Sequence, residues 1–189
     1  MKERILSAAL TLLREQGADA ASARAICDHV GIKAPTLYHH FGNLGNLHQA
    51  VVDAAFARAI EHKRPLVSGD ARADIEHGWD AYVAFAMAEP ALFDLMNRQL
   101  TSAPLSAIAQ ASYGALVDNF RRLQGQGLRT TPELAAQTTW AAAHGVCCFA
   151  AAARFGTPFS PAISATLRRA TLDALLPAQA DSPAVNILA

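Results

Sequence analysis

The sequence has few of the features that mark several large classes of protein. Charged residues are 17% of its 189 residues, and 16 Lys and Arg balance 16 Asp and Glu, so the formal net charge is zero. This balance excludes a strongly basic protein of the kind that coats nucleic acid. Hydrophobic residues are 52% of the chain, which excludes an intrinsically disordered protein.

Cysteine and β-branched apolar residues are also scarce. The three cysteines are Cys27 and the adjacent pair Cys147 and Cys148, and an odd number cannot form a complete disulfide framework. We therefore expect a reducing compartment, the cytoplasm. We also expect no signal peptide, because the charged N-terminus leads into an amphipathic segment that contains Arg14 and Glu15. Valine and isoleucine together number 16, against 42 alanines and 21 leucines. Because alanine and leucine favour helices and β-branched residues favour strands, the sequence predicts an all-α protein.

One uncharged stretch raises the question of a membrane helix. The residues between Glu133 and Arg154 include no Asp, Glu, Lys or Arg, and this length is close to that of a bilayer span. However, the stretch contains Gln137 and His144, and about half of it is alanine, which is a weak membrane residue. A buried helix is the better interpretation, and we expect no membrane partner.

Capping residues, glycines and prolines divide the chain into helical segments of ordinary length. About nine helices are expected. They cover residues 3–16, 22–30, 35–41, 43–63, 71–88, 91–100, 105–123, 132–154 and 162–176. The second and third are only two turns long, which is typical of a short helix pair rather than of a large bundle.

This short pair carries the most informative pattern. A helix-turn-helix needs a small residue inside its first helix, a glycine in the turn and apolar residues where the helices cross. Cys27 and Gly31 supply the first two features. The apolar contacts would come from Ile26, Val30, Ile32 and Leu37. The second helix of such a pair is free to place its N-terminal end in a DNA major groove.

The run from Gly31 to Phe41, Gly-Ile-Lys-Ala-Pro-Thr-Leu-Tyr-His-His-Phe, resembles the TetR family of bacterial transcriptional repressors. An amphipathic first helix ending at Gly17, Ser22 at the start of the second helix and Leu47 in the fourth also fit that family. The resemblance implies a three-helix helix-turn-helix DNA-binding domain over residues 1–48. It further implies a helical ligand-binding and dimerisation domain over 49–176. The remaining residues, 177–189, include Asp181-Ser182-Pro183, and we expect a flexible tail there.

By the same resemblance, residues at the start of the second helix and along the third contact double-stranded DNA. These candidates are Ser22, Arg24, Lys33, Ala34, Pro35, Thr36, Tyr38, His39 and His40. Polar groups among them suit phosphates and base edges, and the apolar ones suit a thymine methyl group. We expect a homodimer on a palindromic operator. One departure is Leu44, which stands where the family usually has a phosphate-binding lysine, and His48 is a partial substitute when protonated.

In the C-terminal part, Trp140 followed by His144-Gly145 resembles the Trp…His-Gly signature of one TetR subgroup. Family architecture implies dimerisation through the last two helices, where alanine and glycine allow close approach. It also implies a cavity for an unidentified small apolar ligand. Its candidate wall is Trp79, Tyr82, Phe85, Phe93, Met96, Tyr113, Leu116, Phe120, Trp140, His144 and Cys147.

Two other functions remain open at this point. His144 with Cys147 or Cys148 has the spacing of one helical face, so it could form a metal site or a base and nucleophile. No further ligand and no orienting acid is near in sequence, so we expect no metal, no cofactor and no enzyme. The alternative is a helical dimeric small-molecule-binding or interaction protein with weak or lost DNA binding, which Leu44 makes more credible.

Overall fold

The computed structural model describes residues 1–17, 19, 21–61, 68–100, 104–153, 156 and 158–177. Within these ranges all regular structure is helical, which confirms the predicted all-α class. The nine helices of this part of the chain are α1 Lys2–Gln16, α2 Ala23–Val30, α3 Ala34–Phe41, α4 Leu44–Glu61, α5 Ala71–Ala88, α6 Pro90–Leu100, α7 Ala107–Arg122, α8 Pro132–Ala152 and α9 Ala162–Leu175. The expected ends at Lys63 and Arg154, and the tail beyond Pro177, lie outside the described residues.

Side-chain caps explain why most helices begin within a residue or two of their predicted starts. The Ser22 hydroxyl accepts the Ala25 N–H at 3.2 Å, and the Asn43 side-chain oxygen accepts the Asn46 N–H at 2.8 Å. Each cap satisfies a backbone donor that has no partner inside the helix. Asp70, Ser106 and Thr131 cap α5, α7 and α8 in the same way.

The turn between α2 and α3 depends on one glycine. Gly31 has φ 74° and ψ 40°, the left-handed conformation in which a side chain is disfavoured, and its N–H bonds the Cys27 carbonyl oxygen at 2.9 Å. This ends α2 sharply, so that α3 can begin three residues later at Ala34. The predicted helix-turn-helix geometry is therefore present.

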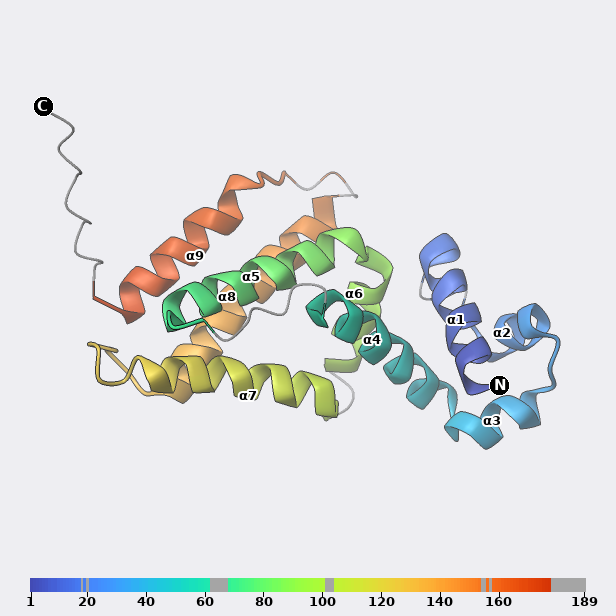
Figure 1. Ribbon diagram of the computed structural model, residues 1–189. Coiled ribbons are helices and arrows are strands. Elements are labelled where there is room, and N and C mark those ends of the chain that lie inside the picture. The colour runs from blue at the N-terminus through green and yellow to red at the C-terminus, as the bar shows by residue number, and fades with distance from the viewer. Residues whose placement is uncertain are drawn as a thin grey trace, which may run out of the picture.

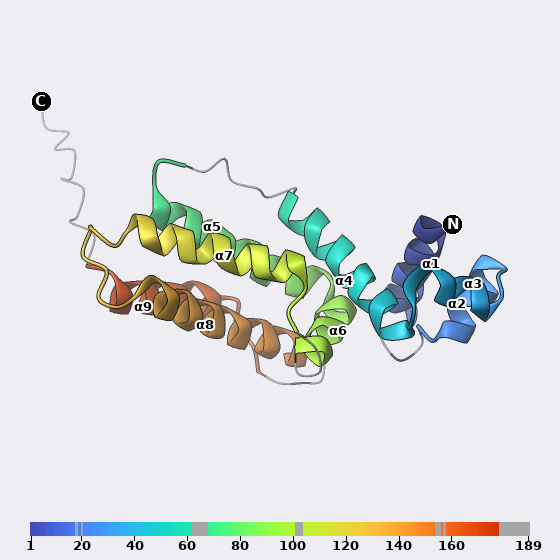
Figure 2. The same cartoon turned by 90° about the horizontal axis from the view of Figure 1, so that it is seen from below.

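The helices form an elongated molecule with α1–α3 at one end and α7–α9 towards the other (Figure 1). Helices α5, α7, α8 and α9 pack as a bundle, and α4 leads from α3 towards it. Seen from below, α4 and α6 lie between the two ends (Figure 2). No described helix has the length and apolar character needed to cross a membrane, α8 included.

The hydrophobic core does not stop at the predicted domain boundary. That boundary, between residues 48 and 49, falls inside α4, which runs unbroken from Leu44 to Glu61. The cluster that holds Leu37 and Phe41 of α3 continues through Val52 of α4 to Phe85 of α5 and Leu92 of α6. The N-terminal helices are thus packed directly onto the helices that follow them.

Candidate DNA-binding surface and ligand cavity

Helix α3 has one buried and one exposed face. Leu37 is fully buried and Phe41 is 7% exposed, and both pack in the core that contains Ile26 and Cys27 of α2. The opposite face turns outward because these two apolar anchors are four residues apart, about one helical turn. Tyr38 is 42% exposed although tyrosine is a large, partly apolar residue. An exposed aromatic with a hydroxyl at its tip is suited to contact a polar partner.

Most of the predicted DNA-contacting residues are exposed in the structure, and we call those from Lys33 to His40 the α3 face. Ser22, Arg24, Lys33, Ala34, Pro35, Tyr38 and His39 are exposed, and Thr36 and His40 are half-buried. The Arg24 side chain is 93% exposed, and its nearest acid, Asp28, is 3.8 Å away, so this pairing is weak. The guanidinium is therefore available for a phosphate.

The region of the missing lysine is apolar. Leu44 is half-buried against the N-terminal core and offers no polar group. His48 lies one turn further along α4, and its Nε2 is 2.9 Å from the Ala21 carbonyl oxygen. A carbonyl oxygen only accepts, so this nitrogen donates its proton inside the fold. A protonated His48 has a second N–H, on Nδ1, so its role as a partial substitute for the lysine stays a prediction.

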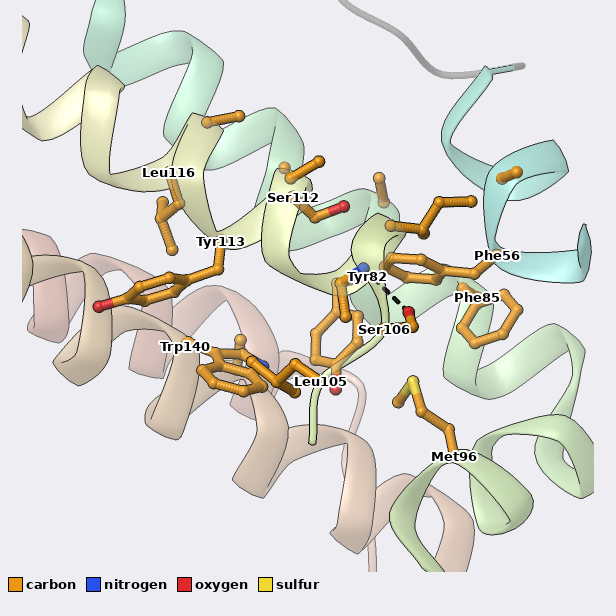
Figure 3. Close-up of a pocket in the computed structure, with 18 of the residues that line it drawn as sticks. Phe56, Tyr82, Phe85, Met96, Leu105, Ser106, Ser112, Tyr113, Leu116 and Trp140 are labelled. Atoms are coloured by element: carbon orange, nitrogen blue, oxygen red, sulfur yellow. Dashed lines mark hydrogen bonds between the residues drawn. The ribbon is translucent and has the colours of Figure 1, made fainter. Parts of the chain in front are cut away.

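A cavity of about 640 Å³ lies between α4, α5, α6, α7 and α8. Figure 3 shows aromatic side chains at both ends, with Phe56, Tyr82 and Phe85 near Met96, and Tyr113 near Trp140. The Phe56 and Phe85 rings meet edge to face with centroids 5.3 Å apart, and the Tyr113 and Trp140 centroids are 5.9 Å apart. A volume of this size with a mostly apolar wall is typical of small-molecule sites.

Seven of the eleven residues proposed from the sequence lie on the wall of this cavity. They are Trp79, Tyr82, Phe85, Met96, Tyr113, Leu116 and Trp140. The other four do not reach it. Phe93, Phe120 and Cys147 are fully buried in the core. His144 is half-buried and bonds Tyr82 instead. Helical periodicity identifies inward-facing residues, but it does not separate those that meet a cavity from those that meet other side chains.

Sequence reasoning missed the contribution of α4. The cavity is also lined by Gln49, Val52, Asp53 and Phe56, whereas the sequence pointed only to the N-terminal end of α4, near DNA. Their spacing of three and four residues was a usable signal, because it places them on one face of a helix. Thr139 on α8 also lines the cavity and was missed.

Tyr82 and His144 form a buried polar pair beside the cavity. The Tyr82 hydroxyl lies 2.8 Å from His144 Nδ1, and the two rings are stacked. Burial raises the pKa of Tyr82 and lowers the pKa of His144. Both shifts favour the neutral forms, in which the tyrosine donates its proton to the imidazole nitrogen.

Burial also affects Cys147, which the sequence offered as a possible nucleophile beside His144. Burial raises the pKa of Cys147 to about 12, so this side chain stays a protonated thiol at neutral pH. Its sulfur faces the Tyr82 carbonyl oxygen at 4.0 Å. Among the described residues, no group of three His, Cys, Asp or Glu could hold a metal ion. In this structure Cys147 is packed in the core and His144 is hydrogen-bonded to Tyr82.

Comparison with known families agrees with this geometry at both ends of the chain. Residues 5–51 match the family model of bacterial regulatory proteins of the TetR family. Residues 75–175, more than half of the chain, match the tetracyclin repressor-like C-terminal domain. The two matched segments contain the helix-turn-helix and most of the cavity wall, respectively.

The individual relatives share less than 40% sequence identity with this chain over the matched residues. An uncharacterised helix-turn-helix regulator of Mycobacterium tuberculosis is 28% identical over 148 residues, 76% of this chain and 67% of that protein. The class A tetracycline repressor from Escherichia coli is 35% identical over 68 residues, 36% of this chain and 32% of the relative. UidR of Escherichia coli is 38% identical over the same length. This chain therefore spans only about a third of each of these last two relatives.

Solved structures share the fold over almost the whole chain. A protein of unknown function from Rhodococcus has a TM-score of 0.71 at 23% identity and covers 92% of this chain and 94% of its own. A TetR variant from Acinetobacter baumannii, solved with minocycline, has a TM-score of 0.69 at 17% identity and covers 90% and 92%. With both family models matched in order along the chain, this protein belongs to the TetR family of DNA-binding transcriptional regulators.

Proposed function

We propose that this protein is a ligand-responsive repressor that binds a palindromic operator as a homodimer in the cytoplasm. The observation that carries the proposal is the α3 face, where Lys33, Thr36 and Tyr38 are available to solvent while Leu37 and Phe41 are fixed in the core. This leaves a rigid helix free to enter a major groove. The nine predicted contact residues are proposed as the DNA-binding set.

Homodimerisation is supported by exposed apolar side chains on α8 and α9. Leu134 is 53% exposed, Phe149 is 52% exposed and Leu167 is 36% exposed, although all three are large and apolar. Leu134 and Phe149 are 15 positions apart on α8, about four turns, so they lie near one stripe of that helix. No residue between 134 and 153 is charged. We propose that α8 and α9 pair with the same helices of a second subunit.

Ligand response is supported by elements that belong both to the cavity and to the N-terminal packing. Val52 and Phe85 line the cavity and lie in the same core as Leu37. Two ion pairs also join α1 and the loop after it to α6 and to the residue that precedes it. Arg14 pairs with Glu89, and Arg98 pairs with Asp19 at 2.6 Å. A ligand that shifts α4 or α6 would therefore shift the α3 face.

The direct test is binding of the purified protein to the DNA upstream of its own gene, compared with random DNA of equal length, over a range of salt concentrations. We expect preference for the upstream DNA and an affinity that falls as salt rises, because phosphate contacts release counterions. Equal affinity for both DNAs at moderate salt would contradict the proposal.

Replacing Tyr38 with phenylalanine is expected to weaken operator binding about 10-fold per half-site, because one hydrogen bond to a charged phosphate is lost. Fluorescence anisotropy with labelled operator measures this change. Tyr113→Phe is the matched control. It also removes a tyrosine hydroxyl, but from the cavity wall, far along the chain from α3. Equal operator affinity of Tyr38→Phe and the wild type would remove the proposed role of the hydroxyl.

Replacing Phe149 with aspartate is expected to raise the dimer dissociation constant about 100-fold or more. The interface would lose a large apolar side chain and gain a carboxylate that is costly to bury. Sedimentation velocity over a concentration series measures the shift to monomer. Met87→Asp on α5 is the control, because Met87 is 53% exposed but lies outside α8 and α9. A dimer of unchanged stability in Phe149→Asp would place the interface elsewhere.

A further inference from the structure

The charges on the cavity wall are unevenly distributed. Among the described residues that line it, Asp53 and Asp74 are acidic, and no lysine or arginine is present. His77 is the one described wall residue that can carry a positive charge. The cavity therefore presents a negative charge to a ligand only where one of these acids has no positively charged partner in the fold.

Asp74 is already neutralised by the fold. Its Oδ2 accepts a hydrogen bond from Arg122 Nη1 at 2.7 Å, and its Oδ1 accepts the Ser68 N–H at 3.2 Å. Arg122 also donates to the Ser68 carbonyl oxygen at 2.6 Å. The carboxylate is 6% exposed and fully occupied by these partners, so it holds α5 and α7 together and is not available to a ligand.

Asp53, unlike Asp74, has a neutral partner among the described residues. It is half-buried on α4, and its carboxylate receives one described hydrogen bond, from Gln49 Nε2 at 2.9 Å. Gln49 carries no charge, so the hydrogen bond leaves the negative charge in place. A carboxylate partly removed from water without a cation is unfavourable, and it attracts a cation that enters the same space.

The wall around Asp53 suits a flat ring system. Phe56 lies three residues further along α4 and therefore on the same side of the helix. Its ring meets Tyr82 with centroids 6.3 Å apart and Phe85 with centroids 5.3 Å apart. Aromatic faces carry partial negative charge, so they attract cations as well as other rings. Figure 3 shows these rings directed towards the same space from α4 and α5.

A second, independent feature also points to a polar occupant. Thr139 on α8 lines the cavity, and its side-chain oxygen is buried without a hydrogen-bond partner in the described structure. The whole residue is 3% exposed. Buried hydroxyls are normally paired, so this one is a place where a ligand can supply the missing partner.

From these features we propose that the cavity binds a flat aromatic monocation, with its positive charge at Asp53 and its rings among Phe56, Tyr82 and Phe85. This inference rests on the proposed function only in taking the cavity as the sensing site. It adds the charge and shape of the ligand, for which the sequence indicated only an apolar molecule.

Three flat three-ring molecules of matched size test the charge. N-methylacridinium is a cation, acridine is neutral at mildly alkaline pH, and anthracenecarboxylate is an anion. In fluorescence titrations of the full-length protein without DNA, we expect the cation to bind about 10- to 100-fold more tightly than acridine, and the anion to bind least. Tightest binding by anthracenecarboxylate, or equal binding of all three, would overturn the proposal.

The Asp53→Asn variant assigns the effect to one residue. It should lower the affinity for N-methylacridinium about 10- to 100-fold and leave the affinity for acridine unchanged. Asp118→Asn is the matched control, because Asp118 is an exposed acid on α7 outside the cavity wall. It should bind all three probes as the wild type does. Unchanged N-methylacridinium affinity in Asp53→Asn would exclude the proposed role of this carboxylate.

Asp53→Asn is nearly isosteric, and its unliganded melting temperature checks that it folds. Should it fail to fold, the order of the three affinities in the wild type still decides the inference. Operator release is measured separately. Tight, Asp53-dependent binding of N-methylacridinium without release from DNA would support this inference but contradict ligand-responsive repression. Release from DNA caused only by anthracenecarboxylate would support ligand-responsive repression but contradict the inference of a cationic ligand.

Discussion

Replacing Phe93 with alanine is expected to lower the free energy of unfolding by about 3–5 kcal/mol, as for other large buried aromatic residues. Phe93 on α6 is fully buried, and its ring packs against Tyr82 and His144 with centroids 6.3 and 5.6 Å apart. Truncation would leave a void where α5, α6 and α8 meet. Urea denaturation followed by circular dichroism measures the loss.

Phe56→Ala is the informative control for this variant. Phe56 is only half-buried and lines the cavity. Its truncation should cost less stability than that of Phe93, but it should weaken binding of a ligand more strongly. If Phe93→Ala instead unfolded at the same urea concentration as the wild type and lost ligand affinity, Phe93 would belong to the cavity wall, as the sequence had indicated.

The second large effect is expected from Asp74→Asn, which should lower the free energy of unfolding at neutral pH by about 2–3 kcal/mol. The substitution leaves the Arg122 guanidinium without its charged partner between α5 and α7, where it is only about one third exposed. Asp80→Asn provides the control, because Asp80 pairs with Arg168 at the surface and its side chain is 60% exposed. That loss should stay within about 1 kcal/mol.

The effect of Asp74 should also depend on pH. The Arg122 guanidinium and the Ser68 N–H hold the pKa of Asp74 below its usual value. The unfolded chain therefore binds this proton more readily than the folded one, and the stabilisation is complete above the ordinary aspartate pKa of about 3.9. This stabilisation is lost as the pH falls through the lowered pKa that Asp74 has in the folded protein. The difference in stability between wild type and Asp74→Asn should thus shrink in acid, and a constant difference would contradict this assignment.

The fold was largely predictable because its signals are local. Ser22 and Asn43 cap their helices within three residues of chain, and Gly31 ends α2 through its own backbone conformation. The α3 face was predictable for the same reason, since Leu37 and Phe41 define its buried side by spacing alone. None of these features depends on which distant helix packs nearby.

The cavity was less predictable because it depends on how five helices meet. Phe93 and Phe85 both fit an inward-facing pattern, but only Phe85 borders the open space. Likewise, Asp53 looks like an ordinary helix-surface acid, because only the packing of other helices around α4 brings it to the wall of a cavity. The charged partner of Asp74 is Arg122, 48 positions away, and the spacing of residues in the sequence does not predict that contact.

The continuity of the core from α3 to α6 limits how this protein can be recombined. A cut after residue 48 would remove Val51 and Val52 from the cluster that holds Leu37, and it would also remove Phe85 and Leu92. Exchange of DNA-reading segments with a relative would have to bring matching α4 and α6 surfaces along with it. A change of operator preference confined to the exposed residues of α3 would leave that packing intact. New DNA specificity is therefore more accessible to this chain through point substitution than through exchange of a module.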